Sequence, residues 1–177
     1  MLNKEWIFAR SLFPLSLAWN VLLGRVLKLR NWWDAIDENV IVGALPFTRD
    51  IESLSQIGVR GVVNTCEEYT GPIDAYNQHN ITQLHVPIID HCPPSLKDIN
   101  TAINFIETYV NMQAKVYVHC KAGRGRSATI ALCWLMKSQK VTAEQGLNQL
   151  INKRSHVNRH IHERESVNEF FKSLNQS

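Results

Sequence analysis

The chain has 177 residues, enough for one domain with a substantial hydrophobic core and few for two. Its net charge is only +3, and this charge is unevenly distributed, because residues 1–30 carry +4 and the remainder carries −1. Such local basicity argues against a general nucleic-acid binder and favours one end of the chain meeting an anionic surface. The four cysteines form no spaced disulfide framework, and no pair has the spacing of zinc ligands.

Residues 7–30 combine an apolar run with a basic tail. The apolar run is shorter than the roughly 20 residues that cross a bilayer. We therefore expect residues 1–30 to form a membrane-associating segment, an interfacial helix or shallow anchor, ahead of a catalytic domain over residues 31–177. A targeting sequence and a helix packed on the protein's own core are the alternatives. The apolar residues at helical steps of three and four are Leu12, Leu15, Trp19, Leu22, Val26 and Leu29.

The rest of the chain alternates short apolar strands with helices. This alternation predicts an α/β fold with a central, mostly parallel sheet of four to five strands, flanked by helices on both faces. Pro87 should make the third strand irregular, and Gly58 should close the first helix. Strands are predicted at residues 40–43, 59–64, 84–89 and 116–118, and helices at residues 48–57, 95–112, 127–137, 142–152 and 163–174.

The most informative stretch, residues 119–127, follows the last predicted strand and reads His-Cys-Lys-Ala-Gly-Arg-Gly-Arg-Ser. A tight loop between a strand and a helix points its backbone amides at one place, so it favours binding of a tetrahedral oxyanion. The same field lowers the pKa of a thiol, and Cys120 should be ionised near neutral pH. Arg126 offers a planar, two-pronged donor to phosphate oxygens, and Ser127 could hydrogen-bond the leaving sulfur.

The predicted catalytic residues of this loop are therefore Cys120, Arg126 and Ser127. The alternative is a buried structural cysteine beside a solvated basic turn. The two loop cations could raise the affinity for an anionic head group or membrane, or be ordinary exposed charges. The loop residues expected to bind substrate are Lys121, Ala122, Gly123, Arg124, Gly125 and Arg126.

This segment resembles the Cys-x5-Arg loop of the protein-tyrosine-phosphatase superfamily, in its dual-specificity branch. Three further stretches, residues 31–46, 64–69 and 154–156, are similar to the mitochondrial PTP-like phosphatases, which remove phosphate from phosphatidylglycerophosphate. The resemblance implies the Cys-x5-Arg phosphatase fold and metal-independent hydrolysis of phosphomonoesters through a cysteinyl-phosphate, with no cofactor. A phosphoinositide phosphatase, a dual-specificity protein phosphatase and a catalytically dead phospholipid-binding module are the alternatives.

An enzyme of this kind needs an acid on a neighbouring loop, because expelling an alkoxide from phosphate requires a proton. Asp90 is the candidate, since it follows the third predicted strand and the family's general acid sits at the matching place. A carboxylate that merely caps the helix beginning at Ser95 is the alternative reading of Asp90. Asp98 is the weaker candidate acid, because it falls inside that predicted helix.

Glu67, Glu68 and Tyr69 follow the end of the second predicted strand. The resemblance implies that this loop lines the active site and favours the lipid substrate, whereas from chemistry alone a solvated acidic turn is as good an interpretation. His119 should order the catalytic loop by hydrogen bonding rather than act as a base.

Other residues receive weaker predictions. Arg154 and His156 match the family's Arg-Ser-His stretch and should lie near the pocket. We place Cys66 and Cys92 on loops near its mouth and Cys133 in the core. The partners we expect are a phospholipid substrate and an anionic membrane surface, with no nucleic acid, no metal and a monomeric chain.

A catalytic thiolate requires a reducing compartment. We expect the protein on a membrane within one: the mitochondrial inner membrane in a eukaryote, or the cytoplasmic face of the membrane in a bacterium.

Overall fold

The protein is described by a computed structural model that covers residue 14 and residues 16–176. Its centre is a five-stranded sheet in the order β1-β2-β5-β3-β4, and every neighbouring pair is parallel except the antiparallel pair of β1 with β2. The predicted fold class, a mostly parallel sheet of four to five strands, is therefore confirmed. The strands are β1 (Trp33–Ala35), β2 (Val40–Gly43), β3 (Val59–Cys66), β4 (Thr82–Ile88) and β5 (Lys115–His119).

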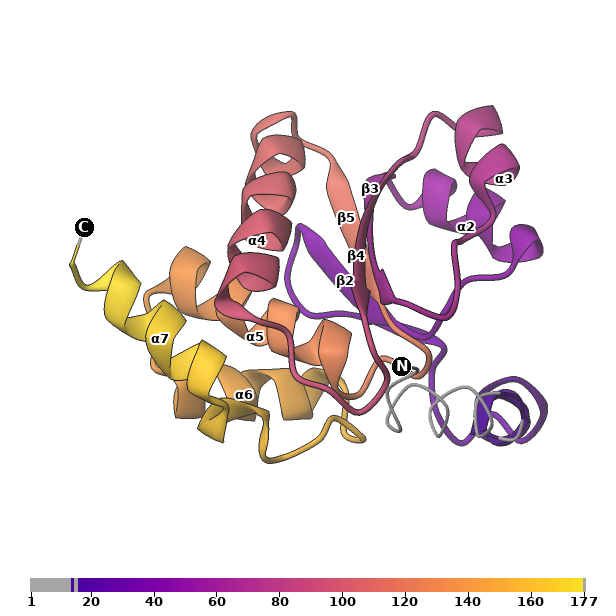
Figure 1. Ribbon diagram of the computed structural model, residues 1–177. Helices are drawn as coiled ribbons and strands as arrows, with labels where there is room; N and C mark the ends of the chain where they lie inside the picture. Colours follow the sequence, from indigo (N-terminus) through magenta and orange to yellow (C-terminus); the bar gives the residue numbers. More distant parts are fainter. Residues whose placement is uncertain (1–13, 15, 177) are drawn as a thin grey trace, which may run out of the picture.

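Helices cover both faces of this sheet (Figure 1). Helices α2 and α3 lie on one face, and α4 and α5 lie on the other, with α6 and α7 packed against α5 on its outer side. The helices are η1 (Leu22–Val26), η2 (Thr48–Asp50), α2 (Ile51–Gln56), α3 (Ile73–Gln78), α4 (Leu96–Asn111), α5 (Arg126–Gln139), α6 (Ala143–Lys153), η3 (Ile161–Glu163) and α7 (Glu165–Leu174).

Strand β5 sits in the middle of the sheet and contributes to both hydrophobic cores. Val116 and Val118 join the larger core with α4 and α5, whereas Tyr117 points to the opposite face and joins the smaller core with α2. This alternation follows from the period of two along a strand. The strand that precedes the catalytic loop is thus held from both sides.

The local sequence signals for helix ends are confirmed. Ser95 caps α4 and forms a capping box with Asp98, and Thr142 does the same for α6 with Gln145. Gly58 follows α2 with a φ of +96°, a left-handed conformation that favours glycine. These signals are local, which is why the sequence alone could reveal them.

Two short elements, β1 and α3, were not predicted. Strand β1 has three residues and α3 has six, and such short segments do not show the apolar period of a strand or of a helix clearly. The third predicted strand begins two residues earlier than expected, at Thr82. The pairing of β3 with β4 shifts register between Asn64 and Cys66, opposite the segment that contains Pro87, as the proline predicts.

The N-terminal segment is helical over residues 16–26, ending in η1. Asn20 and Leu23 face the domain and are buried, whereas Trp19, Val26 and Leu29 of the predicted apolar stripe are 60%, 64% and 70% exposed. Leu12 and Leu15 lie outside the described residues. Across the part of the chain that the structure describes, no helix combines the length and the apolar character needed to span a bilayer.

Candidate active site

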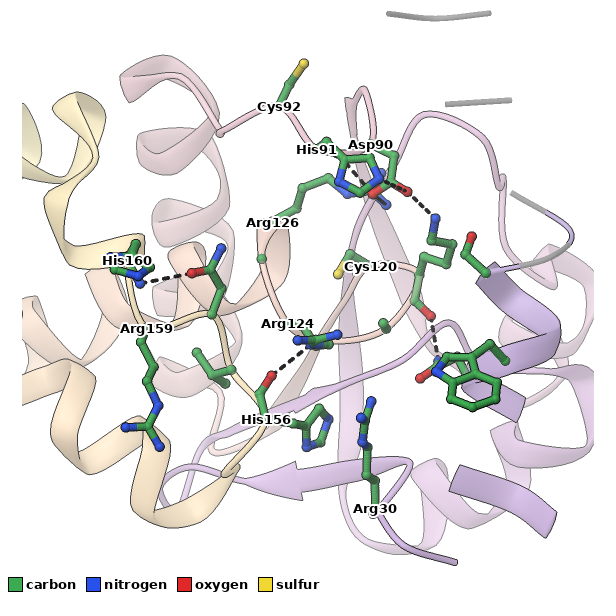
Figure 2. Close-up of a pocket in the computed structure, with 18 of the residues that line it drawn as sticks. Arg30, Asp90, His91, Cys92, Cys120, Arg124, Arg126, His156, Arg159 and His160 are labelled. Atoms are coloured by element: carbon green, nitrogen blue, oxygen red, sulfur yellow. Dashed lines mark hydrogen bonds and ion pairs between the residues drawn. The ribbon is translucent and has the colours of Figure 1, made fainter. Parts of the chain in front are cut away.

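The carboxyl ends of the four parallel strands meet at one edge of the sheet, and the predicted site residues lie there. Strand β5 delivers Cys120, β3 leads to Glu68, and β4 leads to Asp90. Open α/β sheets bind ligands at this edge. A hollow of about 1010 Å³ opens there, lined by Cys120, Asp90, Arg126 and the loop residues between Lys121 and Gly125 other than Gly123 (Figure 2).

The Cys120 sulfur is buried and accepts two hydrogen bonds. Gly123 N–H donates to it at 3.2 Å and the Ser127 hydroxyl at 3.3 Å. Burial alone would raise the pKa of the thiol, but the guanidinium of Arg126 and the hydrogen bonds from Ser127 outweigh burial and lower the pKa to about 7. A large fraction of Cys120 is therefore a thiolate at neutral pH.

The carbonyl groups of the catalytic loop are turned outward and held there by hydrogen bonds. Because the N–H and C=O of a trans peptide point in opposite directions, fixing the carbonyls outward aims the amides at the centre of the loop. A tetrahedral anion above the sulfur would meet these amides. The donors and acceptors are Thr65 to His119 (2.8 Å), Asn20 to Lys121 (3.2 Å), Arg154 to Ala122 (3.1 Å) and Gly123 (2.9 Å), and Asn158 to Arg124 (3.0 Å).

Arg154 is the largest of these supports. Its buried guanidinium pairs with the carboxylate of Asp34 at 2.5 Å while it donates to the carbonyls of Ala122 and Gly123. Gly123 has a φ of +69°, and a Cβ there would lie 2.6 Å from Arg154 and 2.7 Å from the backbone of Gly43. Only glycine fits this position, because any side chain would displace Arg154 or the backbone of Gly43.

Arg126 is held in place by carboxylates on two other loops. Both of its terminal nitrogens lie 2.7 Å from the carboxylate of Glu68, and one lies 2.9 Å from Asp90. Burial would lower the pKa of Arg126, but the hydrogen bonds with Glu68 and the nearby Cys120 raise it. The guanidinium is thus a fixed, permanent cation beside the sulfur, suited to binding phosphate oxygens in a two-pronged manner.

Asp90 lies between two cations, Arg126 and Lys121, and forms ion pairs with both. Burial favours the protonated carboxyl, but the two cations outweigh it and lower the pKa of Asp90 below its ordinary value. Asp90 is therefore ionised in this structure. Asp98, the weaker candidate, is occupied by the cap of α4, where it accepts hydrogen bonds from Ser95.

The residues of the loop after β3 have different partners, and only some of them contact the catalytic loop. Of the three predicted residues, Glu68 contacts Arg126, whereas Tyr69 turns toward Pro46 and donates a hydrogen bond to its carbonyl at 2.6 Å. None of the three lines the hollow. Contacts of Glu67 and Tyr69 with substrate remain predictions.

His119 is completely buried between the rings of Tyr117 and Tyr69. Burial lowers its pKa to about 3, so the imidazole is neutral at physiological pH. This neutral ring packs against the two tyrosine rings, and neither of its nitrogens has a hydrogen-bond partner of good geometry among the described residues. The hydrogen bonding by which His119 was expected to order the loop is therefore not seen.

The remaining cysteines differ in position. The placement of Cys66 on a loop at the mouth was wrong, because Cys66 is the last residue of β3 and is fully buried, which raises the pKa of its thiol. Cys92 is half-buried and lines the hollow, as predicted. Cys133 lies in the core, as predicted. Within the described part of the chain, no group of three or more histidine, cysteine or acidic side chains is arranged to hold a metal ion.

Several site residues were not found from the sequence. Asn20 and Thr65 donate hydrogen bonds to the catalytic loop, Asp34 pairs with Arg154 behind it, and Arg30 lines the hollow. The sequence analysis gave none of them a role, although Thr65 and Asp34 lie in stretches that resemble the family. Arg154 and His156 were expected near the pocket from the family resemblance, and the structure places them there. That Arg154 serves as a buried clamp required the three-dimensional structure.

Comparisons with known proteins agree with this geometry. Residues 42–173 match the model of the dual specificity phosphatase catalytic domain. The phosphatidylglycerophosphate phosphatase PTPMT2 of Arabidopsis thaliana is 36% identical over 164 residues, which cover 91% of this chain and 72% of the relative. The phosphatidylglycerophosphatase and protein-tyrosine phosphatase 1 of Mus musculus is 31% identical over 186 residues, covering 98% and 96%.

The solved structure of PTPMT1 in complex with PI(5)P is also similar. It superposes with a TM-score of 0.77 at 29% identity, over 82% of this chain and 98% of that one. The family match spans most of the chain, and the relatives align over nearly its full length. The chain therefore belongs to the dual specificity phosphatase family and is a cysteine-dependent phosphatase that resembles the phosphatidylglycerophosphate phosphatases within it.

Proposed function

We propose that the reaction proceeds through Cys120, with Arg126 and the loop amides holding the transferred phosphoryl group. The thiolate attacks phosphorus, a sulfur–phosphorus bond forms, and the bond to the alcohol oxygen breaks. Asp90 gives its proton to the departing oxygen. Water then attacks the cysteinyl-phosphate, inorganic phosphate leaves, and the sulfur is released as a thiolate that Ser127 stabilises by hydrogen bonding.

The ion pairs of Asp90 explain how its carboxyl group becomes protonated. A phosphate dianion that binds Arg126 and Lys121 competes with Asp90 for both cations and adds negative charge beside it. Both effects raise the pKa of the carboxyl, so substrate binding itself favours the protonated form that the first step needs. Glu68 keeps Arg126 in position throughout.

The substrate we propose is a phospholipid with a terminal phosphomonoester, namely phosphatidylglycerophosphate. One observation carries this proposal: the N-terminal helix borders the hollow, and its exposed Trp19 is part of the lining. An apolar face beside a phosphate site suits a lipid whose chains remain in a membrane. The names of the relatives support the same substrate class.

The same face supports the membrane as the place of action. We propose that the exposed side of the helix lies in the interface of an anionic membrane, with Lys28 and Arg30 near the headgroups. That membrane would be the mitochondrial inner membrane in a eukaryote and the cytoplasmic face of the membrane in a bacterium. The exposed apolar residues are Trp19, Leu22, Val26, Leu27 and Leu29.

A phosphate-release panel tests the substrate. The purified protein is given vesicles containing phosphatidylglycerophosphate, vesicles containing each of several phosphoinositides, and phosphotyrosine peptides, with Cys120→Ser as the blank. We expect the highest kcat/KM with phosphatidylglycerophosphate. A higher value with phosphoinositides would assign that lipid class instead, and a higher value with peptides would assign protein substrates.

A second experiment tests the role of the apolar face. Replacing Trp19 and Leu29 by serine should lower the rate on vesicles at least tenfold more than the rate on soluble p-nitrophenyl phosphate. Met112→Ser removes an equally exposed apolar residue at the end of α4, outside the lining of the hollow, and should change neither rate. Equal losses on both substrates would contradict a membrane role for the helix.

A further inference from the structure

Besides Arg126, four arginines line the hollow: Arg30, Arg124, Arg159 and Arg164. Arg30 comes from the N-terminal segment, Arg124 from the loop itself, and Arg159 from the segment after α6. Figure 2 shows Arg30, Arg124 and His156 grouped on the side of the hollow opposite Asp90 and His91. Arg124 is fixed there, because its Nε donates to the carbonyl of His156 at 2.9 Å.

The charge of this group is not compensated by the protein. No ion pair joins Arg30, Arg124 or Arg159 to a carboxylate among residues 14 and 16–176. Burial lowers the pKa of Arg30, and the like charges of Arg124 and Arg154 lower it further. Burial lowers the pKa of His156 to about 4, together with the charges of Arg154, Arg30 and Arg124. Arginines that repel one another in a hollow favour binding of an anion.

The order of features across this surface matches the order of groups in one class of lipid. The exposed apolar residue Leu29 is followed directly by Arg30, Arg30 lies near Arg124, and Arg124 belongs to the loop that contains Cys120. A phospholipid whose headgroup ends in a phosphomonoester has acyl chains, then a phosphodiester, then a glycerol bridge and then the terminal phosphate. The apolar residue, the two arginines and the Cys120 loop thus follow the order of the acyl chains, the phosphodiester and the terminal phosphate.

We infer that Arg30 and Arg124 form a second anion subsite, which binds the phosphodiester of a phospholipid headgroup while the Cys120 loop holds the terminal phosphomonoester. This inference rests on the proposed function and names the chemical feature by which the substrate is selected. Guanidinium groups suit it, because they bind phosphate oxygens through two parallel donors and stay charged at all physiological pH values.

The test compares a ligand with two phosphates to a ligand with one, in the absence of membrane. The Cys120→Ser protein is titrated calorimetrically with glycerophosphoglycerol phosphate, the deacylated headgroup, and with glycerol 3-phosphate. In the Arg30→Gln background, we expect the Kd for the headgroup to rise at least tenfold, and at least five times more than the Kd for glycerol 3-phosphate. Lys172→Gln removes one positive charge from exposed α7 and should change neither Kd.

A second readout reports the site directly. An anion among the arginines offsets their repulsion of a proton, so the pKa of His156 followed by NMR should rise when the headgroup binds, and rise less with glycerol 3-phosphate. Equal weakening of both ligands in Arg30→Gln, or an unchanged pKa of His156, would overturn the subsite. An effect of Arg30→Gln confined to adhesion on phosphatidylglycerol vesicles would overturn it too, because Arg30 would then serve only the membrane surface.

The outcome is separable from that of the proposed function. If phosphatidylglycerophosphate is not hydrolysed but headgroup binding depends on Arg30, the substrate proposal fails and the subsite stands. If the lipid is hydrolysed but headgroup binding does not depend on Arg30, the substrate proposal stands and the subsite fails.

Discussion

Two sets of arginines surround the catalytic loop, and they differ in their partners. Arg126 and Arg154 are buried and paired with carboxylates, Glu68 and Asp34 respectively. Arg30 and Arg124 line the hollow and form no ion pair with a carboxylate within the described residues. A buried cation without a partner is costly, so pairing turns the first set into fixed parts of the fold, whereas the second set keeps its charge for a ligand.

The paired set should be the more sensitive to substitution. Arg126→Lys keeps the charge but loses the planar, two-pronged donor and its double contact with Glu68. We expect kcat/KM for p-nitrophenyl phosphate to fall about 10³-fold, the scale of losing a transition-state donor. Arg60→Lys, on the exposed start of β3, is the matched control and should behave as wild type. A loss below tenfold would show that charge alone suffices at position 126.

The pairing of Arg154 should matter for stability. Asp34→Ala leaves the buried guanidinium uncompensated, and we expect the free energy of unfolding to fall by about 3 kcal/mol in urea titrations. The exposed pair of His160 and Glu163 is the comparison, and Glu163→Ala should cost less than about 1 kcal/mol. Similar losses for the two variants would contradict the distinction between buried and exposed pairs.

The third prediction concerns Asp90, which shares Arg126 with Glu68. We expect Asp90→Asn to lower kcat/KM at pH 6 by about 10²-fold, the lower range for loss of a general acid. The pKa of Asp90 is depressed, so its protonated form becomes rarer as pH rises above that value. The variant no longer needs that proton.

The ratio of wild-type to variant kcat/KM should therefore fall steadily between pH 5 and 8, by about tenfold per pH unit for one proton. The titrations of substrate and of Cys120 affect both proteins and cancel in this ratio. A ratio that does not change with pH would mean that Asp90 does not carry the proton.

The features that could be predicted from the sequence are those that depend on residues close together in the chain. The caps at Ser95 and Thr142, the turn at Gly58 and the strand before Cys120 each depend on a few neighbouring residues. The catalytic loop was recognisable because its chemistry needs a thiol, glycines and an arginine at fixed spacing. The dual-specificity family was recognisable for the same reason.

The support of the loop could not be predicted in the same way. Asn20 and Asp34 are ordinary polar residues in sequence, and their role arises because the fold brings them to Lys121 and Arg154, about a hundred residues away. The side of the N-terminal helix that faces water was also not evident, because its apolar stripe fits a core as well as a membrane. The structure places Asn20 and Leu23 inward and the described residues of the stripe, Trp19, Leu22, Val26 and Leu29, outward.

The most direct test of the central claim is the pH dependence of alkylation at Cys120. Iodoacetate is applied across pH 5–10, and modification of Cys120 and of Cys92 is followed separately by peptide mass spectrometry. We expect a midpoint of about 7 for Cys120 and protection of Cys120, more than of Cys92, by inorganic phosphate. A Cys120 midpoint at the value of a free cysteine, about 8.5, with no effect of phosphate, would contradict a thiolate held in an anion-binding loop.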